Sequence, residues 1–390
     1  MNETPQTPIQ LEFKKASSNS SAPIGLRTFS SYSFANSILT PASPFRFTAP
    51  GVDKDVRMKI RSGDWVSMYI PGPNGLRYPI TAGIVDETDT HITASSLEYV
   101  ISGRDILGQL VDNAVVDAQN KIINSKSITL ENALSLLIQN TRIPGSFTTQ
   151  SVPTVPLLLQ TGVGETKINA LQRYLEFTNC LVWVNADGTL TIGKPNFTQE
   201  PSGKLVLDPG APQETNILEA RVKRDVNQAI RQIVTQLQTS EQVDPGSFTK
   251  QNSDPDILPL IPSLVGRSVY SVFSYGQGQD AVNQIYQVGN GQGAPKTLGE
   301  ALSLREIARE NVKIIEVECI VQGHLNENGE VYALDQVYSV VIPDEDVHED
   351  MYVYSISYEL TLEHGMMTKM NLCRLGSICA DAPITSQVNS

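Results

Sequence analysis

Cysteine, histidine and tryptophan are scarce in this chain of 390 residues, which holds four, four and two of them. Cys180 and Cys319 stand alone, and Cys373 and Cys379 form a C-x5-C pair that matches neither a zinc knuckle nor a redox C-x-x-C motif. We therefore expect reduced, mostly buried thiols that act as small apolar side chains. The histidines are too scattered for a histidine-based triad or metal site, and we expect them at the surface or at strand ends. They are His91, His324, His348 and His364.

Long apolar runs are also missing. No stretch approaches the roughly 18 apolar residues of a membrane span. The first residues, MNETPQTPIQLEFKK, lack the basic and apolar regions of a signal peptide. We therefore expect neither a cleaved secretion signal nor a membrane anchor.

Positive charge is in deficit. Lys and Arg number 29 against 42 Asp and Glu, which gives a formal net charge of −13. Tight, salt-dependent binding to nucleic acid or to an anionic membrane needs a basic surface, so this balance disfavours both. A conduit for DNA stays compatible with it, because a negative wall repels phosphate and lets DNA slide.

The common motifs of nucleotide, metal and hydrolase sites are absent as well. The sequence contains no G-x-x-x-x-G-K-[ST], H-E-x-x-H, G-x-S-x-G or EF-hand loop. Residues 276–281 match G-x-G-x-x-A, with Glu300 beyond, but a second glycine-rich run follows and no alternation of strand and helix surrounds them. We therefore predict no cofactor, no metal and no catalytic residue.

Carboxylates are plentiful, and two groups of them are candidate sites. Residues 344–350 form the densest acidic cluster but lack the spacing of a calcium loop, which favours a solvated hairpin connection. Glu316 and Glu318 share one face of a predicted strand, as do Glu359 and Glu363. Glycosidase chemistry needs two carboxylates across a groove, one with a raised pKa, and spacing along a strand shows neither condition.

The first part of the chain has the pattern of short antiparallel strands. Residues 1–28 are rich in Ser, Thr, Asn and Pro and indicate an extended arm. From Phe29 to about residue 105, β-branched and aromatic residues alternate between turn signals such as Asn74-Gly75. This spacing predicts about five strands in a small barrel or sandwich.

Residues 106–199 have a different pattern, which predicts an α+β insert. Thr129 is placed to cap a helix with a one-sided apolar stripe, and a second helix follows from about Thr166. The next segment, CLVWVNADGTLTIGKP, predicts two strands joined by a turn at Asp187-Gly188.

The rest of the chain is predicted to form strands again, with a long segment rich in turn residues among them. Residues 216–237 suit two strands with a turn at Arg224-Asp225. The region from about 240 to 296 is dense in Pro, Gly, Gln, Asn and Ser, which predicts long loops with one short strand, Ser268 to Tyr275. Thr297 is placed to cap the next helix, and residues 310–376 predict a second all-β unit with glycine hairpins.

One run of residues resembles a known family. Tyr99 to Asp112, YVISGRDILGQLVD, resembles the V-x-G-R-D-hydrophobic-x-x-L-x-D signature of baseplate hub proteins from contractile-tailed bacteriophages, especially Mu-like ones. Within this structural turn motif we expect Gly103 to permit a turn beside Arg104, and Asp105 to cap the helical turn that follows. Three later segments follow in the order of that family, namely KINALQRYLEFTNCLVWVNADGTLTIGKP, REIAR with VKIIEVECIVQGHLNENGEVYALDQVYSVVIPDED, and MYVYSISYELTLEHGMMTKMNLCR.

The resemblance implies a mainly β (α+β) fold, with two tail-tube-like antiparallel β-barrel domains and an α+β insert. It divides the chain into an extended arm at 1–28, a first barrel at 29–105 that about 200–240 complete, the insert at 106–199, a loop-rich segment and helix at 241–309, a second barrel at 310–376 and a tail at 377–390. It further implies a homotrimeric ring in the tail baseplate of a virion, assembled in the host cytoplasm. Such a ring adapts a threefold spike to a sixfold tail tube.

The partners that the resemblance implies are other copies of the chain, the tail spike protein, tail tube or tube-initiator proteins, and the wedge proteins of the baseplate. DNA would pass through the channel without specific binding. Two alternatives stay open: the hub or spike base of a related contractile injection system, and a cell-wall glycan hydrolase that uses Glu359 and Glu363.

Overall fold

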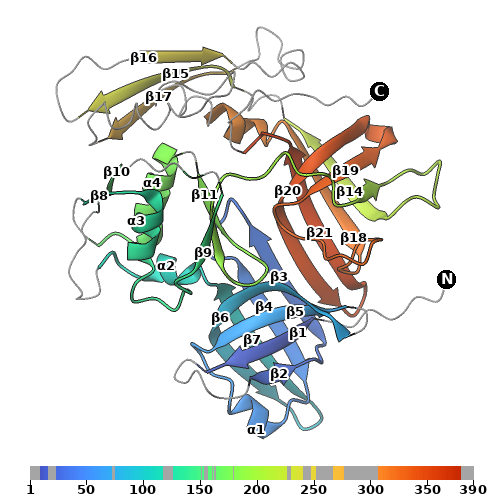
Figure 1. Ribbon diagram of the computed structural model, residues 1–390. Helices are drawn as coiled ribbons and strands as arrows, with labels where there is room; N and C mark the ends of the chain where they lie inside the picture. Colours follow the sequence, from blue (N-terminus) through green and yellow to red (C-terminus); the bar gives the residue numbers. More distant parts are fainter. Residues whose placement is uncertain are drawn as a thin grey trace.

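The computed structural model describes residues 9–15, 23–72, 75–116, 126–150, 152, 157–159, 161, 164–178, 180–225, 230–239, 247–251, 267–275 and 306–378. Its main sheet has thirteen strands and extends through both halves of the chain (Figure 1). The N-terminal half contributes β1 (Gln10–Lys14), β2 (Ile24–Leu26), β3 (Ser31–Ser37), β4 (Pro44–Pro50), β5 (Trp65–Pro71), β6 (Arg77–Ile92) and β7 (Leu97–Asp105), with the short helix α1 (Lys54–Arg57). The C-terminal half contributes β13 (Lys204–Val206), β14 (Ile217–Arg224), β18 (Ile315–Gln322), β19 (Val337–Ile342), β20 (Val347–Thr361) and β21 (Gly365–Arg374), with the 3-10 turn η4 (Pro343–Glu345).

The alternating pattern of the sequence produces these strands. In β5, every second residue of WVSMYIP is buried, and β3 and β4 show the same period of two. Positive φ angles at Gly329 and Gly365 form the predicted turns of the C-terminal half. The mainly β, antiparallel fold class with an α+β insert is therefore confirmed.

The two halves are not closed barrels. The strand order is β14-β18-β21-β20-β3-β4-β7-β6-β5-β1-β2, with β19 and then β13 branching from β20, so the described sheet ends at β14, at β13 and at β2. The long strand β20 explains the difference from the expected pair of barrels, because it pairs with β21 on one side and with β3 on the other. One strand thus hydrogen-bonds both halves into one sheet.

Two further segments pair differently from the expectation. Residues 10–14, which the composition assigns to an extended arm, form β1 and pair with β5, with Ile9, Leu11 and Phe13 buried beneath it. The strands β13 and β14 pair with β19 and β18 of the C-terminal half, whereas residues 200–240 are expected to complete the first unit. Strand pairing between distant segments is set by the whole core, which local patterns do not encode.

The insert contains α2 (Gly108–Asp112), β8 (Lys126–Ile128), α3 (Leu130–Leu137), β9 (Phe147–Gln150), β10 (Leu157–Leu159), α4 (Lys167–Thr178), β11 (Leu181–Val184) and β12 (Leu190–Gly193). Thr129 caps α3 by accepting a hydrogen bond from the Asn132 amide, as the sequence predicts. The hairpin β11–β12 turns at Gly188, whose φ is 81°. A separate apolar core lies inside the insert, between its helices and its small sheets.

A further three-stranded sheet begins in the second strand expected within residues 216–237 and continues into the region expected to be mostly loop. Its strands are β15 (Ile230–Thr239), β16 (Ser247–Gln251) and β17 (Arg267–Tyr275), in the order β16-β15-β17. The strand predicted at 268–275 is confirmed as β17, and β16 was missed because SFTKQ has no apolar alternation. The G-x-G-x-x-A run at 276–281, Thr297 and Glu300 lie outside the described residues.

One apolar core fills the main sheet from β1 to β21. The rings of Phe34 on β3 and Tyr358 on β20 stack within it, with centroids 5.9 Å apart. The N-terminal and C-terminal halves therefore share a core as well as a sheet. Within the described residues, no helix combines the length and the apolar character needed to span a membrane.

Candidate functional site

Gly103, the first residue of the predicted turn motif, lies inside β7 and not at a turn. A Cβ at this position would lie 2.1 Å from the carbonyl oxygen of Ile84 and 2.4 Å from the ring of Phe45. Gly83 on β6 makes room for the same ring, since a Cβ there would lie 2.8 Å from it. Glycine is therefore needed here for close packing and not for a positive φ.

Asp105 ends β7 and fixes the two backbone segments beside it. Its carboxylate accepts a hydrogen bond of 2.8 Å from the Leu107 amide and another of 2.8 Å from the Ser43 amide. Burial raises the pKa of Asp105 to about 6, although these amide donors favour the charged form and oppose the rise. The carboxylate thus holds the start of the insert against the β3–β4 connection.

Arg104 joins the first half of the sheet to the insert from the outer side. Its guanidinium lies 2.7 Å from the Asp86 carboxylate on β6 and 2.6 Å from the Asp112 carboxylate on α2, and it donates two hydrogen bonds to each. This paired geometry lowers the pKa of Asp112. Gly108 leaves space for the stem of Arg104, because a Cβ there would lie 3.3 Å from the arginine Cβ. Arg104 thus links β6 of the sheet to α2 of the insert.

His324 lies two residues after the end of β18, near a strand end as expected, but it is buried and not at the surface. Only 1% of it is exposed. Tyr32 of β3 lies 2.7 Å from its Nε2, and Thr368 of β21 lies 2.9 Å from its Nδ1. Because the Thr368 hydroxyl donates its one hydrogen to the carbonyl of Gly323, Nδ1 must donate to Thr368 and Nε2 must accept from Tyr32. Burial lowers the pKa of His324 to about 4, so it is neutral at pH 7.

The other histidines and the described cysteines match the expectations. His91, His348 and His364 are exposed. Cys180, Cys319 and Cys373 are buried and carry free thiols, and burial raises the pKa of Cys319 to about 12. Cys379 lies outside the described residues.

The carboxylates considered for hydrolysis are engaged separately. Glu316 accepts a hydrogen bond from the Tyr354 hydroxyl, and Glu318 forms an ion pair of 2.8 Å with Lys369. The side chain of Glu363 is 87% exposed beyond the end of β20. Two carboxylates in different environments across one groove are the requirement for glycosidase chemistry, and this arrangement does not provide it.

Of the acidic residues 344–350, the first three lie in or directly after the η4 turn that connects β19 to β20, as expected of a hairpin connection, and the others begin β20. Arg224 pairs with Glu345 and Arg374 pairs with Glu349, each at 2.8 Å. Among the described residues, no group of three or more His, Cys, Asp or Glu side chains is placed to hold a metal ion.

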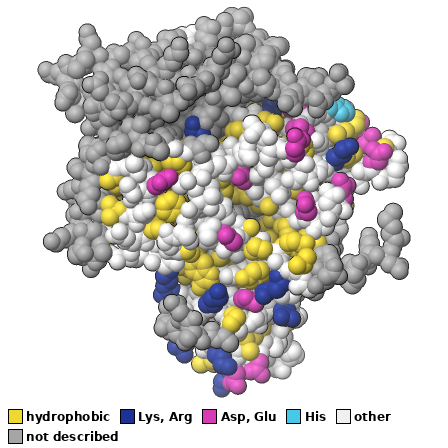
Figure 2. All heavy atoms as spheres, viewed as in Figure 1, with side chains coloured by type: hydrophobic (Ala, Val, Ile, Leu, Met, Phe, Trp, Pro, Cys, Tyr) yellow, Lys and Arg dark blue, Asp and Glu magenta, His cyan; other side chains and the backbone are white. Residues whose placement is uncertain are grey.

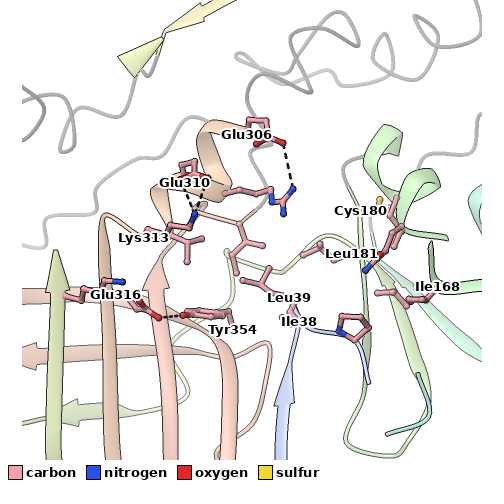
Figure 3. Close-up of a pocket in the computed structure, with 18 residues that line it drawn as sticks. Ile38, Leu39, Ile168, Cys180, Leu181, Glu306, Glu310, Lys313, Glu316 and Tyr354 are labelled. Atoms are coloured by element: carbon pink, nitrogen blue, oxygen red, sulfur yellow. Dashed lines mark hydrogen bonds and ion pairs between the residues drawn. The ribbon is translucent and has the colours of Figure 1, made fainter. Parts of the chain in front are cut away.

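One feature that the sequence does not indicate is a crevice of about 680 Å³ between the insert and the C-terminal half of the sheet (Figure 3). Its lining comes from the end of β3, from α4 and β11, from the helical residues 306–311 and from β14, β18 and β20. These segments are far apart in the chain, so no sequence motif marks the crevice. Buried apolar side chains form its floor, namely Ile38, Ile168, Leu175, Cys180, Val312 and Ile378.

Charged side chains line one side of the crevice. Glu306 pairs with Arg309 at 3.7 Å, and Glu310 pairs with Lys313 at 3.1 Å. Lys223 of β14 also lines it, and no other described residue forms an ion pair or hydrogen bond with its side chain.

The charges of the molecule are unevenly distributed. Residues 306–378 contain four Lys and Arg against fourteen Asp and Glu, whereas residues 9–105 contain ten against nine. Figure 2 shows Lys and Arg side chains gathered over the lower part of the visible face, which is the N-terminal half in Figure 1. The negative charge is therefore concentrated in the C-terminal half.

No family model matches the sequence, and neither does any curated protein. Solved structures do match it. The tail protein from Neisseria meningitidis MC58 has a TM-score of 0.71 and 16% identity, over 95% of this chain and 98% of that one. The 43 kDa tail protein of prophage MuSo2 from Shewanella oneidensis has a TM-score of 0.66 and 17% identity, over 95% of this chain and all of that one.

A more distant match extends the range of this fold. A chain of the PdpA–VgrG complex of Francisella, in its half-lidded form, has a TM-score of 0.53 and 8% identity, over 99% of this chain and 60% of that one. At these identities the matches establish the fold and not the activity. The chain has the fold of these two tail proteins.

Proposed function

We propose that this chain is the structural baseplate hub of a contractile phage tail, a homotrimer that adapts a threefold spike to a sixfold tail tube. The observation that carries the proposal is the match of its whole fold, over 95% of the chain, to tail proteins of Neisseria meningitidis and prophage MuSo2. The shared sheet and the signature from Tyr99 to Asp112 support it. Catalysis is not part of the proposed role.

The architecture supports a mechanical role. In the proposed ring, the two β-rich halves joined by β3 and β20 act as two modules of each chain, so three chains supply six modules for a sixfold partner. A closed ring of identical chains needs a heterologous contact, in which two different faces of the chain meet. Spike, tube and wedge proteins would bind the two ends and the rim of this ring.

The charge distribution supports a passage for DNA through the ring. The C-terminal half carries most of the excess negative charge, so a channel lined by it would repel phosphate. DNA would pass without specific binding, and the protein would be located in the tail baseplate of the virion after assembly in the host cytoplasm.

The decisive experiment measures the molecular mass of the purified protein in solution and images its particles by electron microscopy. We expect light scattering to give three times the chain mass at micromolar concentration and negative-stain images to show a threefold particle with a central hole. A protein that stays monomeric at all micromolar concentrations would refute the trimeric hub.

A second candidate is the hub or spike base of a related contractile injection system. The match to a chain of the PdpA–VgrG complex of Francisella favours this candidate as a variant of the same role. Identification of the particle from which the native protein is purified distinguishes a phage tail from an injection system.

The glycan hydrolase alternative has its own test. Clearing of a peptidoglycan suspension by the wild-type chain, and its loss in Glu359→Gln or Glu363→Gln, would establish hydrolysis. We expect no clearing by any of the three proteins, because the Glu363 side chain is 87% exposed and is not enclosed in a groove with Glu359.

A further inference from the structure

The hairpin between β20 and β21 ends in an unusually exposed apolar side chain. Leu362 is 90% exposed, more than any other large apolar residue described. Glu363 beside it is 87% exposed in its side chain, and the chain turns back at Gly365, whose φ is 72°. At the tip of this hairpin, the leucine and the carboxylate beside it are both accessible to a pocket of a partner protein.

The crevice provides the complementary surface. Its floor is apolar, and its charged side includes Lys223, for which no described residue serves as side-chain partner. Leu39, 43% exposed at the end of β3, extends the apolar surface outward (Figure 3). The apolar floor is complementary to the side chain of Leu362. The ammonium group of Lys223 is opposite in charge to the carboxylate of Glu363.

The hairpin and the crevice lie at opposite ends of the β3–β20 pair. Leu360 pairs with Tyr32 near the hairpin, whereas Ser355 pairs with Ser37 next to the crevice. The five residue steps from Tyr32 to Ser37 span about 16 Å at 3.3 Å per residue. The hairpin therefore cannot reach the crevice of its own chain, but it can reach that of another copy.

We propose that the β20–β21 hairpin of one copy inserts Leu362 into the crevice of the next copy, with Glu363 paired to Lys223. This inference rests on the proposed function, because it names the two faces that meet head to tail in the ring. Burial of one leucine and formation of one exposed ion pair supply only part of the binding free energy of such an interface. The surfaces around the hairpin must supply the remainder.

Cross-linking tests the contact directly. In a Cys379→Ser background, we expect the variant Leu39→Cys with Leu362→Cys to form disulfide-linked trimers under mild oxidation. A disulfide requires Cα atoms within about 7 Å, so the two sites cannot join within one chain. Either single variant should stop at dimers or stay uncrosslinked. A double variant that yields no more linked species than the single variants would overturn the proposal.

Charge reversal tests the ion pair. We expect Glu363→Lys and Lys223→Glu each to weaken self-association at least tenfold in sedimentation velocity, and the double variant to restore most of the loss. Leu362→Ser should weaken it similarly, whereas Ile92→Ser, a change at a 64% exposed apolar residue of β6, should leave it unchanged. No rescue by the double variant would contradict the assignment of the pair.

These outcomes separate the two proposals. If the wild-type chain forms trimers and Leu362→Ser forms them equally well, the hairpin contact is wrong and the trimeric hub stands. If the wild-type chain stays monomeric, both are wrong. If the hairpin inserts into a different protein, the cysteine at position 362 should form cross-links to that protein alone. That result also overturns the contact between copies.

Discussion

At the scale of single residues, burial decides the protonation state and the hydrogen bonds of His324, which the residue type alone does not predict. His324, Tyr32 and Thr368 form a hydrogen-bonded group that joins β3 to the C-terminal strands in the core. The bonds assign one neutral tautomer to the histidine, with its hydrogen on Nδ1. These bonds fix the junction of the two halves, and the histidine is buried there and not at the surface.

The lowered pKa of His324 predicts a loss of stability in mild acid. As the pH falls below the ordinary histidine pKa of about 6.5, His324 is protonated in the unfolded chain. In the folded chain it stays neutral until about pH 4. The difference corresponds to a loss of about 3 kcal/mol of unfolding free energy over this range. Urea titrations from pH 8 to pH 4 should show it in the wild type and not in His324→Gln.

A comparison of the two proteins is needed because Asp105 acts in the opposite direction. Its folded-state pKa of about 6 exceeds the unfolded value, so its contribution to stability falls as the pH rises from about 4 to 6. Both proteins retain Asp105, and the difference between their curves therefore reports His324. Parallel curves across the whole range would show that the histidine is not the source.

Gly103 gives a second prediction at this scale. Gly103→Ala would place a methyl group against a backbone carbonyl and the Phe45 ring, and we expect a loss of about 3 kcal/mol in unfolding free energy. Gly145→Ala is the matched control, since a Cβ at that position would have no atom within 4 Å, and it should change stability by less than about 0.5 kcal/mol. Equal stability of the two variants in chemical denaturation would contradict the packing role.

At the scale of elements, local patterns identified the strands and helices that carry clear periodicity or caps. Thr129 and the apolar stripe after it marked α3, and Asp187-Gly188 marked the β11–β12 hairpin. The strand β1 was missed because its short run, QLEFK, stands in a segment of turn residues. Only its pairing with β5 and the core beneath it make it a strand.

The strand β1 supplies a prediction for an element. Leu11 is fully buried, so Leu11→Ala should cost about 2–5 kcal/mol of unfolding free energy, as for other core leucines. Lys14→Ala, at an exposed position of the same strand, should cost little. Thermal denaturation of both variants would check this, and a small effect of Leu11→Ala would mean that the segment is the loose arm that the composition suggested.

At the scale of the whole molecule, the shared sheet predicts one cooperative unit. The pairing of β3 with β20 and the stack of Phe34 on Tyr358 join the N-terminal and C-terminal halves through one core. We therefore expect both halves of the main sheet to unfold together. Hydrogen exchange in increasing denaturant should give the same midpoint for the amides of β5 and of β21, and two separate midpoints would show independent domains.

The sequence by itself determined the secondary structure of the periodic segments, the turns at glycine, the inert thiols and the excess of negative charge, because each depends on a residue and its near neighbours. The tertiary structure alone decided that β20 joins two halves into an open sheet, that β13 and β14 belong to the second half, that His324 is buried, and that Gly103 makes room for a ring. It also decided the crevice, which is lined by segments from residue 38 to residue 378. These features arise from contacts between residues distant in the chain, whose free energy depends on the assembled core and leaves no local pattern in the sequence.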